Sequence, residues 1–276
     1  MTTDSSAAPG ELRAAWPATI RAEWTKLRTL PSTAWLLTGA AALTIAVSAI
    51  VAATTHVTST RSAGSGGQDP TKLALTGIDL GQAVIVVLAV LTVCEEYGTG
   101  MIRVTLAAIP RRPAVLAAKA VNLVGLALVA GLVAVAGCLI AGRMTPPGAG
   151  LGPAHGYSLV SLAHPATLRA ATGSVIYLVL IALLALGVAT AVRDTAVSVG
   201  AVLGLLYGPP LLAQAVSDPL RRHIQQIAPM TAGLAIQATT NLRNLPIAPW
   251  AGLGVLAAWA AASLLVGGAL LRRRDA

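Results

Sequence analysis

The densest group of reactive side chains in this 276-residue sequence is an acidic run just beyond residue 94. Two adjacent carboxylates precede an aromatic ring, two glycines and an arginine. The run consists of Glu95, Glu96, Tyr97, Gly98, Thr99, Gly100, Met101, Ile102 and Arg103. Paired carboxylates beside a glycine hinge suit ion pairing with a soluble partner. A plain connector at a membrane surface is the alternative, but anionic lipid repels doubled carboxylates.

Covalent catalysis has little support elsewhere in the sequence. An intramembrane enzyme needs a nucleophile with a base, or two carboxylates, at membrane depth. The apolar stretches contain no histidine, and Asp79 is the only acid within them. The four histidines lie between stretches without ligand spacing, and Cys94 and Cys138 fall at opposite faces of the expected topology. We therefore expect no catalytic residue, metal site or cofactor on this chain.

Composition places these side chains in a membrane protein. The chain is 55% hydrophobic and 11% charged, whereas a soluble domain has roughly 25% charged residues. Each apolar stretch approaches or exceeds the length that crosses a hydrocarbon core, where only helices satisfy the backbone. The sequence therefore predicts an all-α integral membrane protein with one transmembrane domain over residues 1–276 and six transmembrane helices, at about 34–54, 77–94, 117–141, 170–191, 196–216 and 250–271.

The basic residues indicate how the chain is oriented. The formal net charge is +9, but the basic groups cluster at the ends of apolar stretches, which favours lipid headgroups over nucleic acid as partners. The larger share of Lys and Arg falls before the first span, after even-numbered spans and after the last one. The positive-inside rule therefore predicts that both termini are cytoplasmic.

The segment before the first span resembles a helix that lies in the headgroup plane. We expect a disordered tail over 1–16 and an amphipathic helix over 17–29, with Trp24 on its apolar stripe and Lys26 beside it. Glu23 projects onto the same stripe, where a carboxylate facing lipid would be costly. It is expected to pair with Lys26 or with a basic group elsewhere, or else to be an ordinary carboxylate on the helix surface.

The acidic run is expected to form a turn and a short helix. In this interpretation the second span ends at Cys94, and Gly98 ends the helix in a left-handed conformation. Thr99 then caps a two-turn helix over about 100–108, which Pro110 stops. Such a rigid helix, held along the membrane between two spans, could transmit a push from a soluble partner.

A few polar or helix-breaking residues fall inside the spans. Intramembrane polar groups are candidates for a transport pathway, and a Tyr-Gly-Pro-Pro sequence is expected to break the fifth span near its middle. Ordinary solvation and a static kink are the alternatives. Gly125 and Gly131 do not match G-x-x-x-G spacing and indicate only generic packing. The possible pathway residues are Asp79, Gln82, Asn122, Tyr207, Pro209 and Pro210.

In order and spacing these pieces resemble one family along nearly the whole chain. Residues 21–28, 96–103, 107–112, 228–233 and 249–253 are similar to segments of ABC-2 type ABC transporter permeases, particularly small actinobacterial ones. The resemblance implies that residues 17–29, with Glu23, Trp24 and Lys26, are an elbow helix. It implies that residues 95–103 form a cytoplasmic coupling helix contacting an ATPase, and that residues 228–233 belong to a re-entrant hairpin.

The same resemblance implies a function and partners. The chain would be a permease subunit in the bacterial plasma membrane, a homodimer or paired with a sister permease, and would export a hydrophobic or amphipathic substrate. The sequence contains no Gly-Lys dipeptide and so no phosphate-binding loop. ATP and Mg²⁺ would bind to a separate ABC ATPase. A non-transporting membrane scaffold or sensor that binds a cytoplasmic partner is the alternative.

Overall fold

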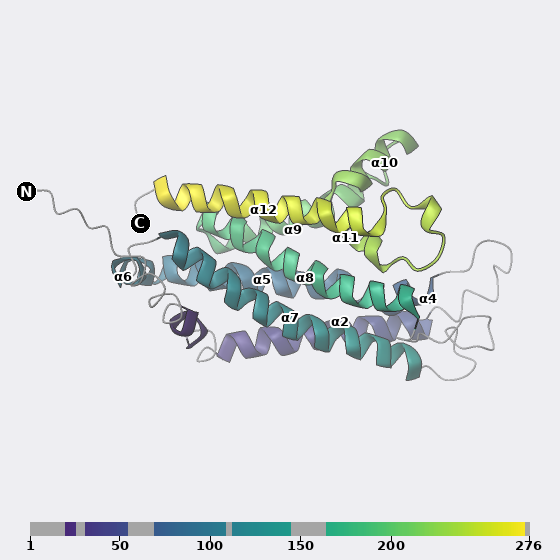
Figure 1. The fold of residues 1–276 in the computed structure, drawn as a ribbon, viewed down its shortest axis with the longest axis horizontal. Coiled ribbons are helices and arrows are strands. Elements are labelled where there is room, and N and C mark those ends of the chain that lie inside the picture. The colour runs from purple at the N-terminus through teal and green to yellow at the C-terminus, as the bar shows by residue number, and fades with distance from the viewer. Residues whose placement is uncertain (1–19, 26–30, 55–68, 109–111, 145–163, 274–276) are drawn as a thin grey trace, which may run out of the picture.

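The protein is an elongated bundle of helices (Figure 1). The computed structural model describes residues 20–25, 31–54, 69–108, 112–144 and 164–273, and these residues form helices and connections without a strand. Six helices are long and apolar enough to cross a membrane, which confirms the expected all-α membrane fold. They are α2 (Pro31–Thr54), α5 (Ile78–Gly98), α7 (Arg112–Met144), α8 (Pro165–Val192), α9 (Thr195–Leu212) and α12 (Pro249–Arg273).

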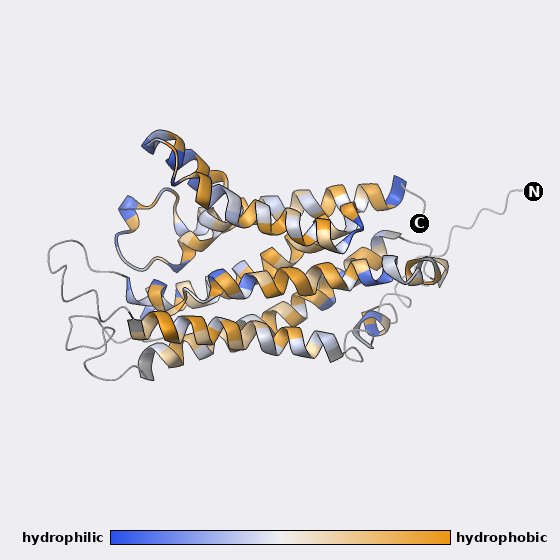
Figure 2. Ribbon diagram, turned by 180° about the vertical axis from the view of Figure 1, so that it is seen from behind, coloured by the Kyte–Doolittle hydropathy of each residue, from blue (hydrophilic) through white to orange (hydrophobic). Residues whose placement is uncertain are grey.

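Short helices lie at the two ends of this bundle. One end, called here the α6 end, holds residues 20–25, α6 (Met101–Ala108) and the end of α12 (Figure 1). The opposite end, the hairpin end, holds α4 (Pro70–Ala74), α10 (Asp218–Ile227), α11 (Pro229–Leu234) and the 3₁₀ turns η2 (Ala235–Gln237) and η3 (Leu242–Asn244). Hydrophilic residues gather toward both ends and hydrophobic ones along the spans (Figure 2), as a bilayer requires.

Helix α8 is the centre of the bundle. It packs against α5, α7, α9 and α12, and Tyr177, Ile181 and Leu184 on it are fully buried. Such a helix is apolar on every side because it faces protein all round. The outer helices α2, α9 and α12 keep most of their apolar side chains at the surface, where lipid can cover them.

Helices α2 and α5 meet where two glycines remove the side chains between them. Gly77 and Gly81 are four residues apart, and a Cβ built on either one would lie within 2 Å of an atom of Thr44. Ser48 on α2 adds a hydrogen bond, because its Oγ accepts from the amide of Gly77 at 3.0 Å. Backbones therefore approach closely here, as small residues permit in membrane bundles.

The end of α5 differs from the sequence expectation. The helix continues to Gly98 and not merely to Cys94, so the two glutamates lie in its last turn. The left-handed residue is Gly100, with φ of 72°, and not Gly98. Thr99 closes α5, since its hydroxyl donates to the carbonyl of Glu95 at 2.8 Å; it was expected to begin the next helix. The expected short helix is present as α6.

Other boundaries shift for local reasons. Helix α7 runs from Arg112 to Met144 and so extends beyond the apolar stretch 117–141 at both ends. Helix α9 ends at Leu212, so Pro209 and Pro210 lie in its last turn and not at its middle. Prolines lack the amide hydrogen that would continue the helical ladder, which explains termination soon after them. The expected tail over 1–16 and Lys26 of the elbow helix lie outside the described residues.

Candidate functional site

Lys119 joins three separate segments at the α6 end. Its ammonium lies 2.8 Å from Oε2 of Glu23, in the segment 20–25, and 2.8 Å from Oε1 of Glu96, in the last turn of α5. It also donates to the carbonyl of Thr92 at 3.1 Å. An ammonium has three donors, and these three acceptors use all of them. We call Glu23, Glu96 and Lys119 the charge cluster.

The charge cluster is buried on all three sides. Glu23, Glu96 and Lys119 are each less than one-tenth exposed. Charges taken out of water at this cost persist only when they are paired and hydrogen-bonded. Two carboxylates share one ammonium, so Lys119 bridges two like charges. The cluster therefore holds the N-terminal segment, α5 and α7 in one arrangement.

Asn122 extends this contact one turn along α7. Its Nδ2 donates to the carbonyl of Ile20 at 3.0 Å, so it holds the same N-terminal segment that carries Glu23. Sequence reasoning grouped Asn122 with possible pathway residues, but it lies at the α6 end, apart from Asp79. Trp24, on the exposed side of the segment, is positioned to face the surroundings of the bundle.

Helix α6 carries an exposed apolar face. Met101 and Val104 are 48% and 71% exposed, whereas Ile102 and Thr105 are buried toward the bundle. Glu95 is exposed beside this face, although its neighbour Glu96 is buried in the charge cluster. The acidic pair therefore divides into one carboxylate directed inward and one open to a partner. Exposed apolar side chains bordered by polar ones are typical of a surface that contacts another protein or a membrane.

The connection between α8 and α9 also reaches the α6 end. Arg193 ends α8 in a left-handed conformation, and its guanidinium lies 5.0 Å from the ring centre of Tyr97, a cation–π contact. Asp194 then caps α9 by accepting from the amide of Val197 at 2.8 Å. Through Tyr97 the end of α5 thus contacts the turn that connects two further spans.

A second polar group lies toward the hairpin end. The carbonyl of Asp79 accepts from the hydroxyl of Tyr207 and from Nε2 of Gln82. Gln82 also accepts from the hydroxyl of Tyr177 and donates to Sδ of Met230 at 3.4 Å. These contacts bring together three of the expected pathway residues, Asp79, Gln82 and Tyr207. Pro209 and Pro210 follow Tyr207 closely in sequence and lie in the last turn of α9.

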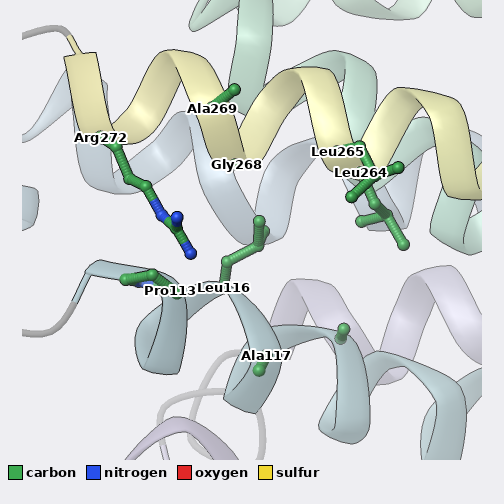
Figure 3. A pocket seen from close by; sticks show the side chains of 9 residues that line it. Pro113, Leu116, Ala117, Leu264, Leu265, Gly268, Ala269 and Arg272 are labelled. Carbon is green, nitrogen blue, oxygen red and sulfur yellow. The ribbon is translucent and has the colours of Figure 1, made fainter.

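An apolar crevice opens between α7 and α12 near the α6 end (Figure 3). Its volume is about 510 Å³. Leu116 and Leu265 are among the side chains that line it, and Arg272 extends from α12 toward Pro113 and Leu116. Its lining includes no carboxylate, thiol or hydroxyl, so the crevice offers apolar contact and one cation.

A comparison with known families matches most of this arrangement. The model of a family described as ABC-2 family transporter protein matches residues 19–208. The chain belongs to the ABC-2 transporter family. The match includes the charge cluster and α6 and stops before α10, α11 and α12. No curated protein matches the chain.

Family membership gives the site a context. An ABC-2 family protein is a membrane transport component of an ABC transporter, and the family in general works with an ABC ATPase. The sequence pattern of this ABC-2 protein indicated that Glu95–Arg103 form one contact region. It did not indicate that Lys119 pairs with Glu96 or that Val104 is exposed on the same end of the bundle. Lys119 was counted only as a basic residue near a span end, and Val104 only as part of a short helix. An unusual signal did mark Lys119: a charge within an otherwise apolar stretch.

Proposed function

We propose that this chain is the permease subunit of an ABC exporter, driven by ATP hydrolysis on a separate ABC ATPase that binds ATP and Mg²⁺. The exposed face of α6 beside Glu95 carries the proposal, because it pairs a docking surface with a buried connection to the spans. In this proposal the α6 end and both termini are cytoplasmic, and the protein lies in a bacterial plasma membrane.

The charge cluster supports a route by which a displacement of α6 by the ATPase would reach the spans. An ATPase that displaces α6 would first move the last turn of α5, to which Gly100 connects it. Glu96 in that turn is paired with Lys119 on α7, and Lys119 is paired with Glu23. Displacement of α5 would therefore be shared with α7 and the N-terminal segment, and rigid elements joined in this way move together.

The substrate in this proposal is hydrophobic or amphipathic. One bundle of six spans would work with a second copy of itself or with a sister permease, as the family resemblance implies. Asp79, Gln82 and Tyr207 are the pathway candidates that lie together. Asn122 is better explained by its contact with the N-terminal segment.

The test measures ATPase binding and turnover with the full chain in nanodiscs. Val104→Asp places a charge on the exposed apolar face of α6, and we expect at least a tenfold loss of affinity for the partner ATPase together with loss of stimulated turnover. The matched control is Leu220→Asp, which places the same charge on an exposed apolar position of α10 at the hairpin end and should change neither quantity.

Three outcomes decide the proposal. Loss of binding in Val104→Asp alone supports docking on α6. Equal binding by Val104→Asp and wild type would show that the ATPase docks elsewhere. Wild-type binding without any change in ATPase turnover would favour the alternative, a non-transporting scaffold or sensor subunit.

A further inference from the structure

The hairpin end contains a polar pocket, and of the pathway candidates only Asp79 is among its lining residues. Its volume is about 420 Å³, within the range of small-molecule sites. It lies where α4 and the start of α5 face α10, α11 and η3. The side chains of Lys72, Asp79 and Gln237 are among those that line it.

Gln237 supplies the first sign that the pocket takes a ligand. Its side chain is 2% exposed, yet within the described part of the chain its Nε2 has no hydrogen-bond partner. A buried donor left without an acceptor costs about 1–3 kcal/mol, and such groups are rare in native proteins. An acceptor atom placed in the pocket would remove this cost.

The two charges of the pocket supply the second sign. Lys72 is exposed and Asp79 is partly buried, and both line the pocket. Between described residues, no hydrogen bond or ion pair is formed by the ammonium of Lys72 or by the carboxylate of Asp79. The carbonyl of Asp79 is occupied by Tyr207 and Gln82, while its carboxylate remains available. A ligand with one positive and one negative group would satisfy both charges and the amide of Gln237.

The walls of the pocket are held in place without a ligand. Asp69, which caps α4, accepts from the amides of Thr239 and Thr240 and from the hydroxyl of Thr239 at 2.6 Å. Arg169 on α8 donates to the carbonyl of Ala238 at 2.6 Å, and Gln226 donates to that of Pro246 at 2.8 Å. A site that is already formed loses less freedom on binding.

We propose that this pocket binds a zwitterionic group, with an ammonium at Asp79 and a phosphate or carboxylate at Lys72 and Gln237. Either the headgroup of an aminophospholipid or a free zwitterion of the same chemistry could provide it. A metal ion fits less well, since no group of three metal-ligating side chains exists among the described residues. The proposal goes beyond export and does not depend on an ATPase.

The test uses the full chain in detergent and follows its thermal unfolding with three probes. Phosphatidylethanolamine in mixed micelles carries both charges, glycerophosphoethanolamine is its free headgroup, and phosphatidylglycerol carries the anion alone. We expect a raised unfolding midpoint with phosphatidylethanolamine and not with phosphatidylglycerol. A response to the free headgroup as well assigns binding to the headgroup itself, whereas a response to the lipid only makes the lipid the source. No response to either, or an equal response to phosphatidylglycerol, would overturn the proposal.

Two variants separate a ligand site from a structural role. Asp79→Asn should weaken binding at least tenfold, while Asp218→Asn, an exposed carboxylate on α10 outside the pocket lining, should leave it unchanged. Gln237→Met keeps the side-chain length but removes the donor. It should raise the midpoint of the ligand-free protein and weaken ligand binding. A raised midpoint with unchanged binding would mean that the amide is merely an unsatisfied group, and the proposal would fail.

Discussion

At the scale of single residues, the two adjacent glutamates have different roles. Glu96 is buried and paired with Lys119, whereas Glu95 is exposed at the surface. One residue along a helix is a rotation of about 100°, which is enough to direct one carboxylate into the bundle and its neighbour outward. Substitution of both together would mix loss of folding with loss of docking, so they must be changed separately.

The charge cluster gives a stability prediction at this scale. Lys119→Met removes the buried cation that bridges Glu23 and Glu96, so we expect a loss of about 3–5 kcal/mol in the free energy of unfolding. Glu96→Gln removes only one of two anions and should cost about 1–3 kcal/mol. Glu95→Gln is the matched control, with no measurable loss. Denaturation in mild detergent measures all three, and equal stability of Lys119→Met and wild type would contradict a buried cluster.

At the scale of helices, the spans are held together by close backbone approach. Helix α5 contacts α2 through Gly77 and Gly81, which are four residues apart. A lipid-facing helix gains little from the hydrophobic effect on meeting another, so contact area and hydrogen bonds decide the pairing. A side chain at either glycine would separate the two backbones.

Gly77→Ala tests this contact. A Cβ there would lie 1.9 Å from the carbonyl oxygen of Thr44, so the backbones must shift, and we expect about 1–3 kcal/mol of destabilisation by overpacking. Gly125→Ala on α7 is the control, because a Cβ at Gly125 has no neighbour within 4 Å. It should be neutral or slightly stabilising. Equal unfolding midpoints for both variants would argue against tight packing between α2 and α5.

At the scale of the whole molecule, six spans place two short-helix regions at opposite ends. Our proposal assigns the α6 end to the cytoplasm because, by sequence, the larger share of Lys and Arg falls before the first span, after even-numbered spans and after the last one. The exposed apolar face of α6 then faces the compartment that contains ATP. The polar pocket at the hairpin end then faces the opposite side of the membrane.

This orientation predicts a labelling pattern. In a background without native cysteines, Arg243→Cys on η3 should react with an impermeant maleimide in intact cells, whereas Val104→Cys on α6 should react only after the membrane is opened. Both positions are exposed on the protein, so accessibility across the membrane decides the result. Native Cys94 and Cys138 are buried, so little labelling of either is expected even where they remain. The reverse pattern would invert the topology.

Much of the fold followed from local properties of the chain. Hydropathy and helix geometry account for the six spans, for the short helix after the second span and for the position of most charged residues at the ends of the spans. Helix ends were less predictable. Gly98 and Gly100 are equally suited to a left-handed turn, and the choice of Gly100 lets α5 continue to Gly98, which keeps Glu96 in its last turn beside Lys119.

The sequence by itself determined that this is a helical membrane protein with an acidic, amphipathic connection after its second span, because burial in lipid restricts both composition and backbone. Only the tertiary structure decided which charges meet. Glu23, Glu96 and Lys119 are separated by up to 96 residues, and no periodicity links them. Gln237 likewise became informative only when the fold buried it in the lining of a pocket. Pairing between distant segments depends on packing of the whole bundle, which local patterns do not specify.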